Sequence, residues 1–114
     1  MDNNIKPIKV YISGALTNDP GQNARFGRTA VWLNTFGVEA VNPVSTALYS
    51  RKHRIDRALE MLRDCDMICM IPGWQASEEA RLEHHYAEVV GVPEFTIPEI
   101  VWREINEQGG TTET

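Results

Sequence analysis

Glu83 is the residue whose position in the sequence most clearly suggests chemistry. A helix over residues 78–90 would carry an inward stripe at helical spacing that comprises Ala80, Glu83, Ala87 and Val90. An ionisable carboxyl among apolar neighbours costs free energy unless it is paired or used, so such positions often belong to functional sites. A small rotation of the helix would instead leave Glu83 at the edge of the stripe, in an ordinary ion pair with Arg81 or a neighbouring histidine.

Ser77 lies at the expected start of the same helix. Its hydroxyl can cap the free N–H groups of the first turn. The positive end of the helix dipole and those N–H groups can equally hold a phosphate. Gly73 and Trp74 just before it would then supply a flexible backbone and a stacking surface, although Trp74 can also serve as a lid or a dimer contact.

The elements that position these residues follow from the apolar pattern. Short runs rich in apolar and β-branched residues predict strands over residues 8–13, 38–41, 66–71 and 95–97. Helical spacing predicts helices over residues 24–36 (with Gly37 as the C-cap), 51–63, 77–90 and 98–107. Because parallel strands need crossover connections, this alternation predicts a single-domain, three-layer α/β/α sandwich of the Rossmann or flavodoxin type, with a mainly parallel sheet of four or five strands. Residues 1–108 are expected to form this domain and residues 109–114 a disordered tail.

Ligands of such folds bind beyond the carboxyl ends of the strands. The candidate substrate-binding residues at those ends are Ser13, Gly14, Asn42, Gly73 and Trp74. Tyr11 lies within the first strand, where a core aromatic is the usual role, although its hydroxyl can reach the carboxyl end of the sheet.

Composition and charge restrict the class of protein. The 114 residues allow one domain and exclude a multidomain enzyme with a separate cofactor module. A net charge of −5 argues against a duplex nucleic-acid partner, because phosphate contacts need a surplus of Lys and Arg. Neither a membrane-spanning run nor a signal peptide is recognisable, so we expect a cytoplasmic protein.

The sequence contains no motif for a bound cofactor. A Gly-x-Gly-x-x-Gly fingerprint, a phosphate-binding Gly-Lys-Ser/Thr loop and a Cys-x-x-Cys pair are all missing. His84 and His85 point about 100° apart on a helix and do not form a metal pair. Cys65 and Cys69 are too few for a structural zinc site and are expected to be buried free thiols. An enzyme without a cofactor or metal is favoured.

Four segments carry distinctive motifs, at residues 10–17 (VYISGALT), 42–43 (NP), 64–68 (DCDMI) and 72–83 (PGWQASEEARLE). Together they resemble the nucleoside 2-deoxyribosyltransferase-like superfamily, and most closely a small phage and bacterial branch related to the deoxynucleoside 5′-monophosphate N-glycosidases. The resemblance implies that Glu83 is the nucleophile, that Tyr11 supports it and that Ser77 binds a 5′-phosphate. Thr17 and the loop after Gly14 would help around that phosphate.

One position departs from the family pattern. Relatives carry an Asp eight residues before the Asp that opens the central strand, and counting back eight residues from Asp66 gives Ala58. Asp56 lies two residues before Ala58 and Glu60 two residues after it. On a helix, an offset of two residues rotates a side chain by about 200°. Asp56 is our candidate for the catalytic acid, provided that the helix is wound to bring it to the pocket.

Three functions are compatible with the sequence. The first is an N-glycosidase or 2-deoxyribosyltransferase that acts through Glu83, and the second is a nucleotide-binding module that is catalytically weak because of Ala58. The third is a hydrolase of an NAD-derived or cyclic nucleotide. In each case the partner is a small nucleoside or nucleotide, and the apolar residues of the last helix (Ile100, Val101, Trp102 and Ile105) favour a homo-oligomer.

Overall fold

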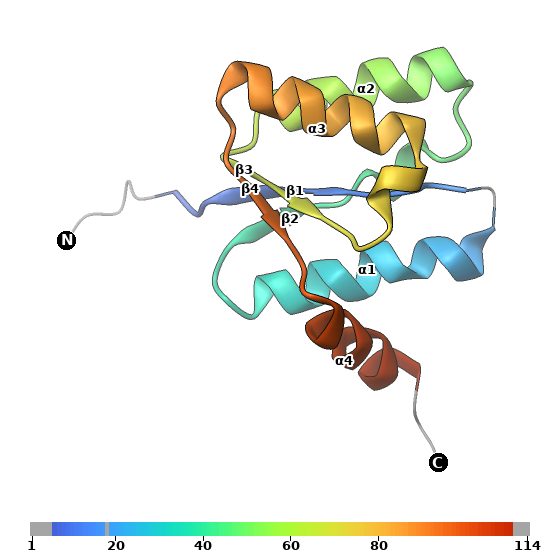
Figure 1. Cartoon of the computed structure of the whole chain (residues 1–114), viewed down its shortest axis with the longest axis vertical. Helices are drawn as coiled ribbons and strands as arrows, with labels where there is room; N and C mark the ends of the chain where they lie inside the picture. The colour runs from blue at the N-terminus through green and yellow to red at the C-terminus, as the bar shows by residue number, and fades with distance from the viewer. Residues whose placement is uncertain (1–5, 18, 111–114) are drawn as a thin grey trace.

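Four parallel strands form the central layer of the molecule (Figure 1). The computed structural model describes residues 6–17 and 19–110. The strands are β1 (Lys9–Ser13), β2 (Glu39–Val41), β3 (Met67–Met70) and β4 (Glu94–Thr96), in the spatial order β2-β1-β3-β4. Every neighbouring pair is parallel, with Tyr11 opposite Val41 on one side and Ile68 on the other.

Helices cover both faces of this sheet. α2 (Arg51–Arg63) and α3 (Glu78–Val90) lie side by side on one face, and α1 (Pro20–Asn34) and α4 (Glu99–Gly110) lie on the other (Figure 1). The predicted three-layer α/β/α sandwich with a parallel sheet is therefore confirmed, with four strands. Two single turns of 3-10 helix, η1 (Pro43–Thr46) and η2 (Trp74–Ala76), were not predicted, because one turn is too short to show a periodic pattern.

Both ends of α1 differ from the prediction. α1 begins at Pro20 rather than residue 24, because the carboxylate of Asp19 caps it by accepting a hydrogen bond from the Gly21 N–H at 2.9 Å. Its C-cap is Thr35, and Gly37, with φ of +81°, follows in the turn that leads to β2.

The helix α4 extends into the segment that was expected to be a disordered tail. The backbone of Gly109 and Gly110 continues α4, since each residue added to a formed helix gains one hydrogen bond at little extra cost. The remainder of that tail, residues 111–114, lies outside the described residues.

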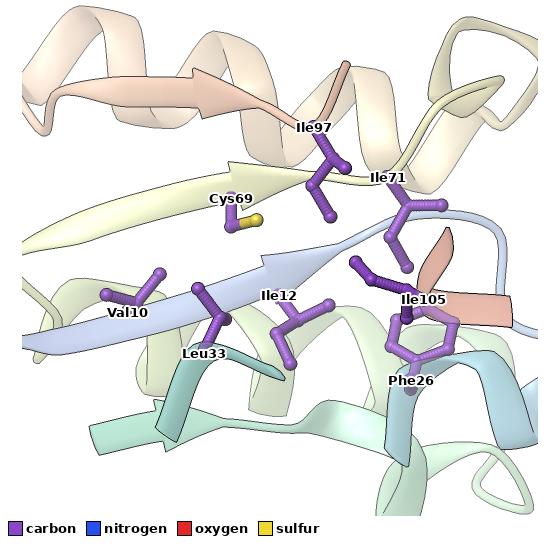
Figure 2. Packing of buried hydrophobic residues seen from close by; sticks show 8 residues of the cluster. All are labelled: Val10, Ile12, Phe26, Leu33, Cys69, Ile71, Ile97 and Ile105. Carbon is purple, nitrogen blue, oxygen red and sulfur yellow. The ribbon is translucent and has the colours of Figure 1, made fainter. Parts of the chain in front are cut away.

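Alternation along β1 and β3 divides the core into two clusters. Val10, Ile12 and Cys69 point toward α1 and α4, where they pack with Phe26 and Ile105 (Figure 2). The alternate side chains of the two strands, those of Tyr11, Ile68 and Met70, point toward α2 and α3. They belong to a second cluster, which comprises Tyr11, Ala58, Leu62, Cys65, Ile68, Met70, Ala80 and Ala87. Both cysteines are buried free thiols, as predicted.

The order of the strands defines where a ligand is expected. The chain runs from β1 to β2 on one side and then crosses to β3 on the other side of β1, so the direction reverses between β1 and β3. In open parallel sheets, ligands bind in the crevice outside the carboxyl ends of the strands at such a reversal. Those ends are Ser13 and Met70, which lie opposite each other in the ladder.

Among the residues that the structure describes, no helix combines the length and the apolar character that crossing a membrane requires.

Candidate active site

Glu83 lies between α3 and the sheet at the carboxyl end of β1. Its side chain is buried, with the residue only 7% exposed. The Tyr11 hydroxyl lies 3.1 Å from Oε2, and the Ser13 hydroxyl lies 2.6 Å from Oε1. The inward position predicted from helical spacing is therefore correct, and the alternative of an edge ion pair is not what the structure contains.

The geometry of a strand explains why two hydroxyls reach one carboxyl group. Successive side chains of a strand point to opposite faces, so Tyr11 and Ser13 share a face while Ile12 points to the other core cluster. Both residues are completely buried. A single strand thus places a donor on each oxygen of Glu83, and the orientation of the carboxyl group is determined.

Burial dominates the titration of Glu83. Loss of solvent raises its pKa to about 7, even though the hydrogen bonds from Ser13 and Tyr11 favour the charged form and lower it. The negative charge of Glu79 raises it further. Near neutral pH both protonation states of Glu83 are therefore populated, as expected of a group that exchanges protons.

The pKa of Tyr11 is raised well above its ordinary value, first by burial and then by the adjacent Glu83. Tyr11 accordingly stays protonated and acts as a hydrogen-bond donor to the carboxylate.

An ion pair between α2 and α3 lies one turn before Glu83. Arg54 donates from Nε to Glu79 Oε1 at 2.8 Å and from its second guanidinium nitrogen to Glu79 Oε2. The two side chains are only 18% and 20% exposed. We did not predict this pair, although a signal exists: basic residues crowd the start of the 51–63 helix, and Glu78 and Glu79 open the next one.

Ser77 is the N-cap of α3. Its Oγ accepts a hydrogen bond from the Ala80 N–H at 3.1 Å, which confirms the capping prediction. Gly73 precedes η2 with φ of +89°, a conformation that only glycine adopts without strain. Phosphate binding at this turn stays a prediction.

Trp74 packs against α3 rather than standing alone. Its ring lies 4.6 Å from the ring of His84, centroid to centroid. His84 Nδ1 in turn lies 2.5 Å from Glu94 Oε1 at the start of β4. The indole is half-buried and leaves part of its surface available beside the η2 turn.

Gly14 has a structural role at the end of β1. A Cβ at this position would lie 3.1 Å from Cβ of Ile71, a tight contact that would require Ile71 to shift. The glycine therefore allows the segment after β1 to pass next to the segment after β3, at the point where the strand order reverses.

Thr17 and Asn42 meet at a neighbouring cavity of about 340 Å³. The Asn23 side chain forms two hydrogen bonds with the backbone of Thr17. Its Oδ1 accepts from the Thr17 N–H at 3.0 Å, and its Nδ2 donates to the Thr17 carbonyl at 2.7 Å. Asn42 caps η1 by accepting from the Val44 N–H. Glu83 is not among the residues that line this cavity.

Asp56 is not brought to the site. Its side chain is 58% exposed and pairs with Lys52 one turn earlier in α2. Ala58 and Leu62 are the α2 residues that are buried in the core cluster of Tyr11, and their burial turns Asp56 toward solvent. Asp56 would face the site only if α2 were rotated about its axis, and the helix does not have that orientation.

Within residues 6–17 and 19–110, no cluster of three or more His, Cys, Asp or Glu side chains is arranged to hold a metal ion.

The fold and the site define a parallel α/β protein with a buried, hydroxyl-bound glutamate at the switch in strand order. A family described as a domain of unknown function, DUF4406, matches residues 8–95, and the chain belongs to this family. The match covers β1 to β3, α1 to α3 and the first two residues of β4, and it includes Tyr11, Ser13 and Glu83. Comparisons with curated proteins and with solved structures found no significant match.

Proposed function

We propose that this protein cleaves or transfers the N-glycosidic bond of a nucleoside, deoxynucleoside or 5′-monophosphate, with Glu83 as the nucleophile. The observation that carries the proposal is the buried carboxyl group of Glu83, held on both oxygens by hydroxyls from β1 at the carboxyl end of the sheet. The motifs shared with the nucleoside 2-deoxyribosyltransferase-like superfamily point to the same residue.

The reaction proceeds in two displacements. A carboxylate oxygen of Glu83 attacks C1′, the C1′–N bond breaks, and its electron pair leaves with the base, which takes up one proton. Water or a second base then attacks C1′ and breaks the new ester bond, so that Glu83 returns as a carboxylate. When water is the acceptor, one of its protons stays on the new sugar hydroxyl and the other goes to solvent; when a base is the acceptor, the proton on its attacking nitrogen goes to solvent.

Tyr11 and Ser13 act as positioning groups in this scheme. Their hydroxyls orient the carboxylate and stabilise its charge before attack and after release. Because the pKa of Glu83 is about 7, the active ionised fraction rises with pH across neutrality, and the rate rises with it.

The turn before α3 is the proposed phosphate subsite. Ser77 and the N–H groups of the first turn of α3 offer donors to a 5′-phosphate, and the half-buried Trp74 offers a surface for the base. We place the sugar between this turn and the β1 end, with Gly14, Thr17 and Asn42 bordering the other side.

A second candidate function rests on Ala58. Ala58, which lies in the same core cluster as Tyr11, has no proton to give to a leaving base, and Asp56 faces solvent. This favours a slow enzyme, or a nucleotide-binding module that uses the same pocket. A cytoplasmic homo-oligomer is part of the proposal, since a neighbouring subunit could contribute the missing acid and the exposed Val31, Phe36 and Ile100 offer apolar surface for assembly.

The test is incubation of the protein with a panel of ribo- and deoxyribonucleosides, their 5′-monophosphates, NAD and cyclic nucleotides, with free base measured by chromatography. We expect base release by the parent and none by Glu83→Gln. Base release at the parental rate by that variant would disprove the nucleophile. If no compound is cleaved but a nucleotide still raises the melting temperature, the binding module is the correct function.

A further inference from the structure

The groove between α1 and α4 gathers three arginines on the face of the sheet opposite Glu83. Arg25 and Arg28 of α1 and Arg103 of α4 line a cavity of about 530 Å³, together with Trp102. A cavity of this size accommodates a small metabolite. The motifs of the sequence assign nothing to it, and Arg103 lies beyond the matched family region.

Two of the guanidinium groups are held in place without a carboxylate. Arg25 donates to the carbonyls of Gln22 at 2.7 Å and Ala15 at 3.0 Å. Arg28 donates twice to Asn106 Oδ1, at 3.1 and 2.9 Å. The amide of Asn106 is itself fixed by donating to the Trp102 carbonyl at 2.8 Å, so its oxygen faces Arg28.

The hydrogen-bond partners of Arg25 and Arg28 are neutral, and the three arginines outnumber the two carboxylates, of Asp19 and Glu107, that line the same cavity. The ion pairs formed within the described part of the chain all involve side chains other than these three arginines. Burial lowers the pKa of Arg25, and repulsion by the like charge of Arg28 lowers it further. An anion bound between them would relieve this repulsion.

The other walls of the groove suit the remainder of a small ligand. Gly21 and Gln22 belong to the first turn of α1, where the Asp19 carboxylate already accepts the hydrogen bond from the Gly21 N–H. The carboxylates of Asp19 and Glu107 also line the cavity and are acceptors for hydroxyl groups. Trp102 adds an aromatic surface.

We propose that the groove between α1 and α4 binds a sugar phosphate, free or as part of a nucleotide. Arg25, Arg28 and Arg103 bind the phosphoryl group, and the carboxylates at the rim bind sugar hydroxyls. The site is independent of the proposed glycosidase reaction, because the sheet separates it from Glu83.

The proposal is tested by NMR on the whole chain labelled with ¹⁵N, following the arginine Nε–Hε signals. The probes are inorganic phosphate, ribose 5-phosphate, adenosine 5′-monophosphate and ribose. We expect the three phosphorylated probes to shift the signals of Arg25, Arg28 and Arg103, and ribose to leave them unchanged. Ribose 5-phosphate should bind more tightly than inorganic phosphate, and equal affinities would overturn the sugar-phosphate assignment. If adenosine 5′-monophosphate binds more tightly than ribose 5-phosphate and quenches tryptophan fluorescence, the ligand is a nucleotide. If the two bind equally tightly, the ligand is a free sugar phosphate.

Variants separate this groove from the turn at Ser77. Arg28→Gln and the exposed Arg103→Gln should each weaken binding of ribose 5-phosphate about tenfold, since each removes a charge-assisted hydrogen bond. Arg57→Gln, an exposed arginine of α2, is the matched control and should bind as the parent does. Ser77→Ala should leave the arginine shifts intact. Two results would overturn the proposal without affecting the proposed function. One is NMR shifts confined to residues 73–80, and the other is that Arg28→Gln and Arg103→Gln both bind ribose 5-phosphate as tightly as the parent.

Discussion

The hydroxyl of Ser13 lies 2.6 Å from Oε1 of Glu83, although the two residues are 70 positions apart in the chain. Ser13 ends β1, and Glu83 lies in the middle of α3. The contact therefore joins the end of the first strand to a helix that follows the third strand. Together with Tyr11 it turns a buried carboxyl group, which would otherwise destabilise the fold, into an oriented functional group.

The raised pKa of Glu83 predicts a specific dependence of stability on pH. The folded chain retains this proton from the ordinary value of 4.5 up to about pH 7, so unfolding releases a proton in that window and the free energy of unfolding falls as pH rises. The full effect is roughly 3 kcal/mol, reached above pH 7. Glu83→Gln should remove it, so that urea denaturation at pH 4.5 and pH 8 gives a smaller difference for the variant than for the parent. An unchanged difference would contradict the assignment.

The two hydroxyls should differ in their effect on Glu83. Each donates to the charged form, so Ser13→Ala and Tyr11→Phe should both raise the pKa of Glu83 above about 7. Ser13→Ala should raise it more, because its hydrogen bond is shorter, at 2.6 Å against 3.1 Å. The measurement is a carbon-13 NMR titration of the glutamate side-chain carboxyls. A fall in the pKa in either variant would refute this description of the site.

The Arg54–Glu79 ion pair should affect the pKa of Glu83 electrostatically, without a hydrogen bond to it. Arg54→Gln leaves the negative charge of Glu79 unpaired, which should raise the pKa of Glu83, whereas Glu79→Gln removes that charge and should lower it. Arg54→Gln should also cost roughly 2 kcal/mol of stability. Arg57→Gln, which breaks an exposed pair with Glu60 on the same helix, is the control and should change neither quantity. Shifts of the same sign in Arg54→Gln and Glu79→Gln would rule out the electrostatic explanation.

Two glycines should respond oppositely to the same substitution. Gly14→Ala places a Cβ 3.1 Å from Ile71 in a buried site, and we expect it to destabilise the fold by about 1–3 kcal/mol. Gly27→Ala lies within α1 with open space around the added methyl group, and should stabilise the fold by about 0.5–1 kcal/mol. Thermal or urea denaturation measures both. Equal changes would mean that the approach of Gly14 to Ile71 is not tight.

Neither cysteine should react in the folded protein at neutral pH. Burial is the main cause that raises the pKa of Cys65 to about 11 and of Cys69 to about 12, and the thiolate is the reactive form. Labelling with iodoacetamide and mass spectrometry should find both thiols unmodified until denaturant is added. Rapid labelling of the native chain at Cys69 would contradict the burial of β3.

The alternation of strands and helices, and the inward position of Glu83, could be predicted from local spacing. Period-2 and period-3.6 patterns report which face of an element is apolar, and this information lies within a few neighbouring residues. For the same reason the capping role of Ser77 was predicted correctly. The short turns η1 and η2 were missed because a single turn shows no periodic pattern, and the exact start of α1 was missed because it depends on one capping bond from Asp19.

The partners of Glu83 required the tertiary structure. Whether Tyr11 and Ser13 reach α3, whether Arg54 pairs with Glu79, and whether Asp56 or Ala58 faces the site all depend on how helices rotate and pack against a sheet. Such contacts join segments that are far apart in sequence, and local patterns carry no record of their distances. The sequence by itself determined the class of fold and the residue to examine, and the packing of α2 and α3 on the sheet decided what surrounds that residue.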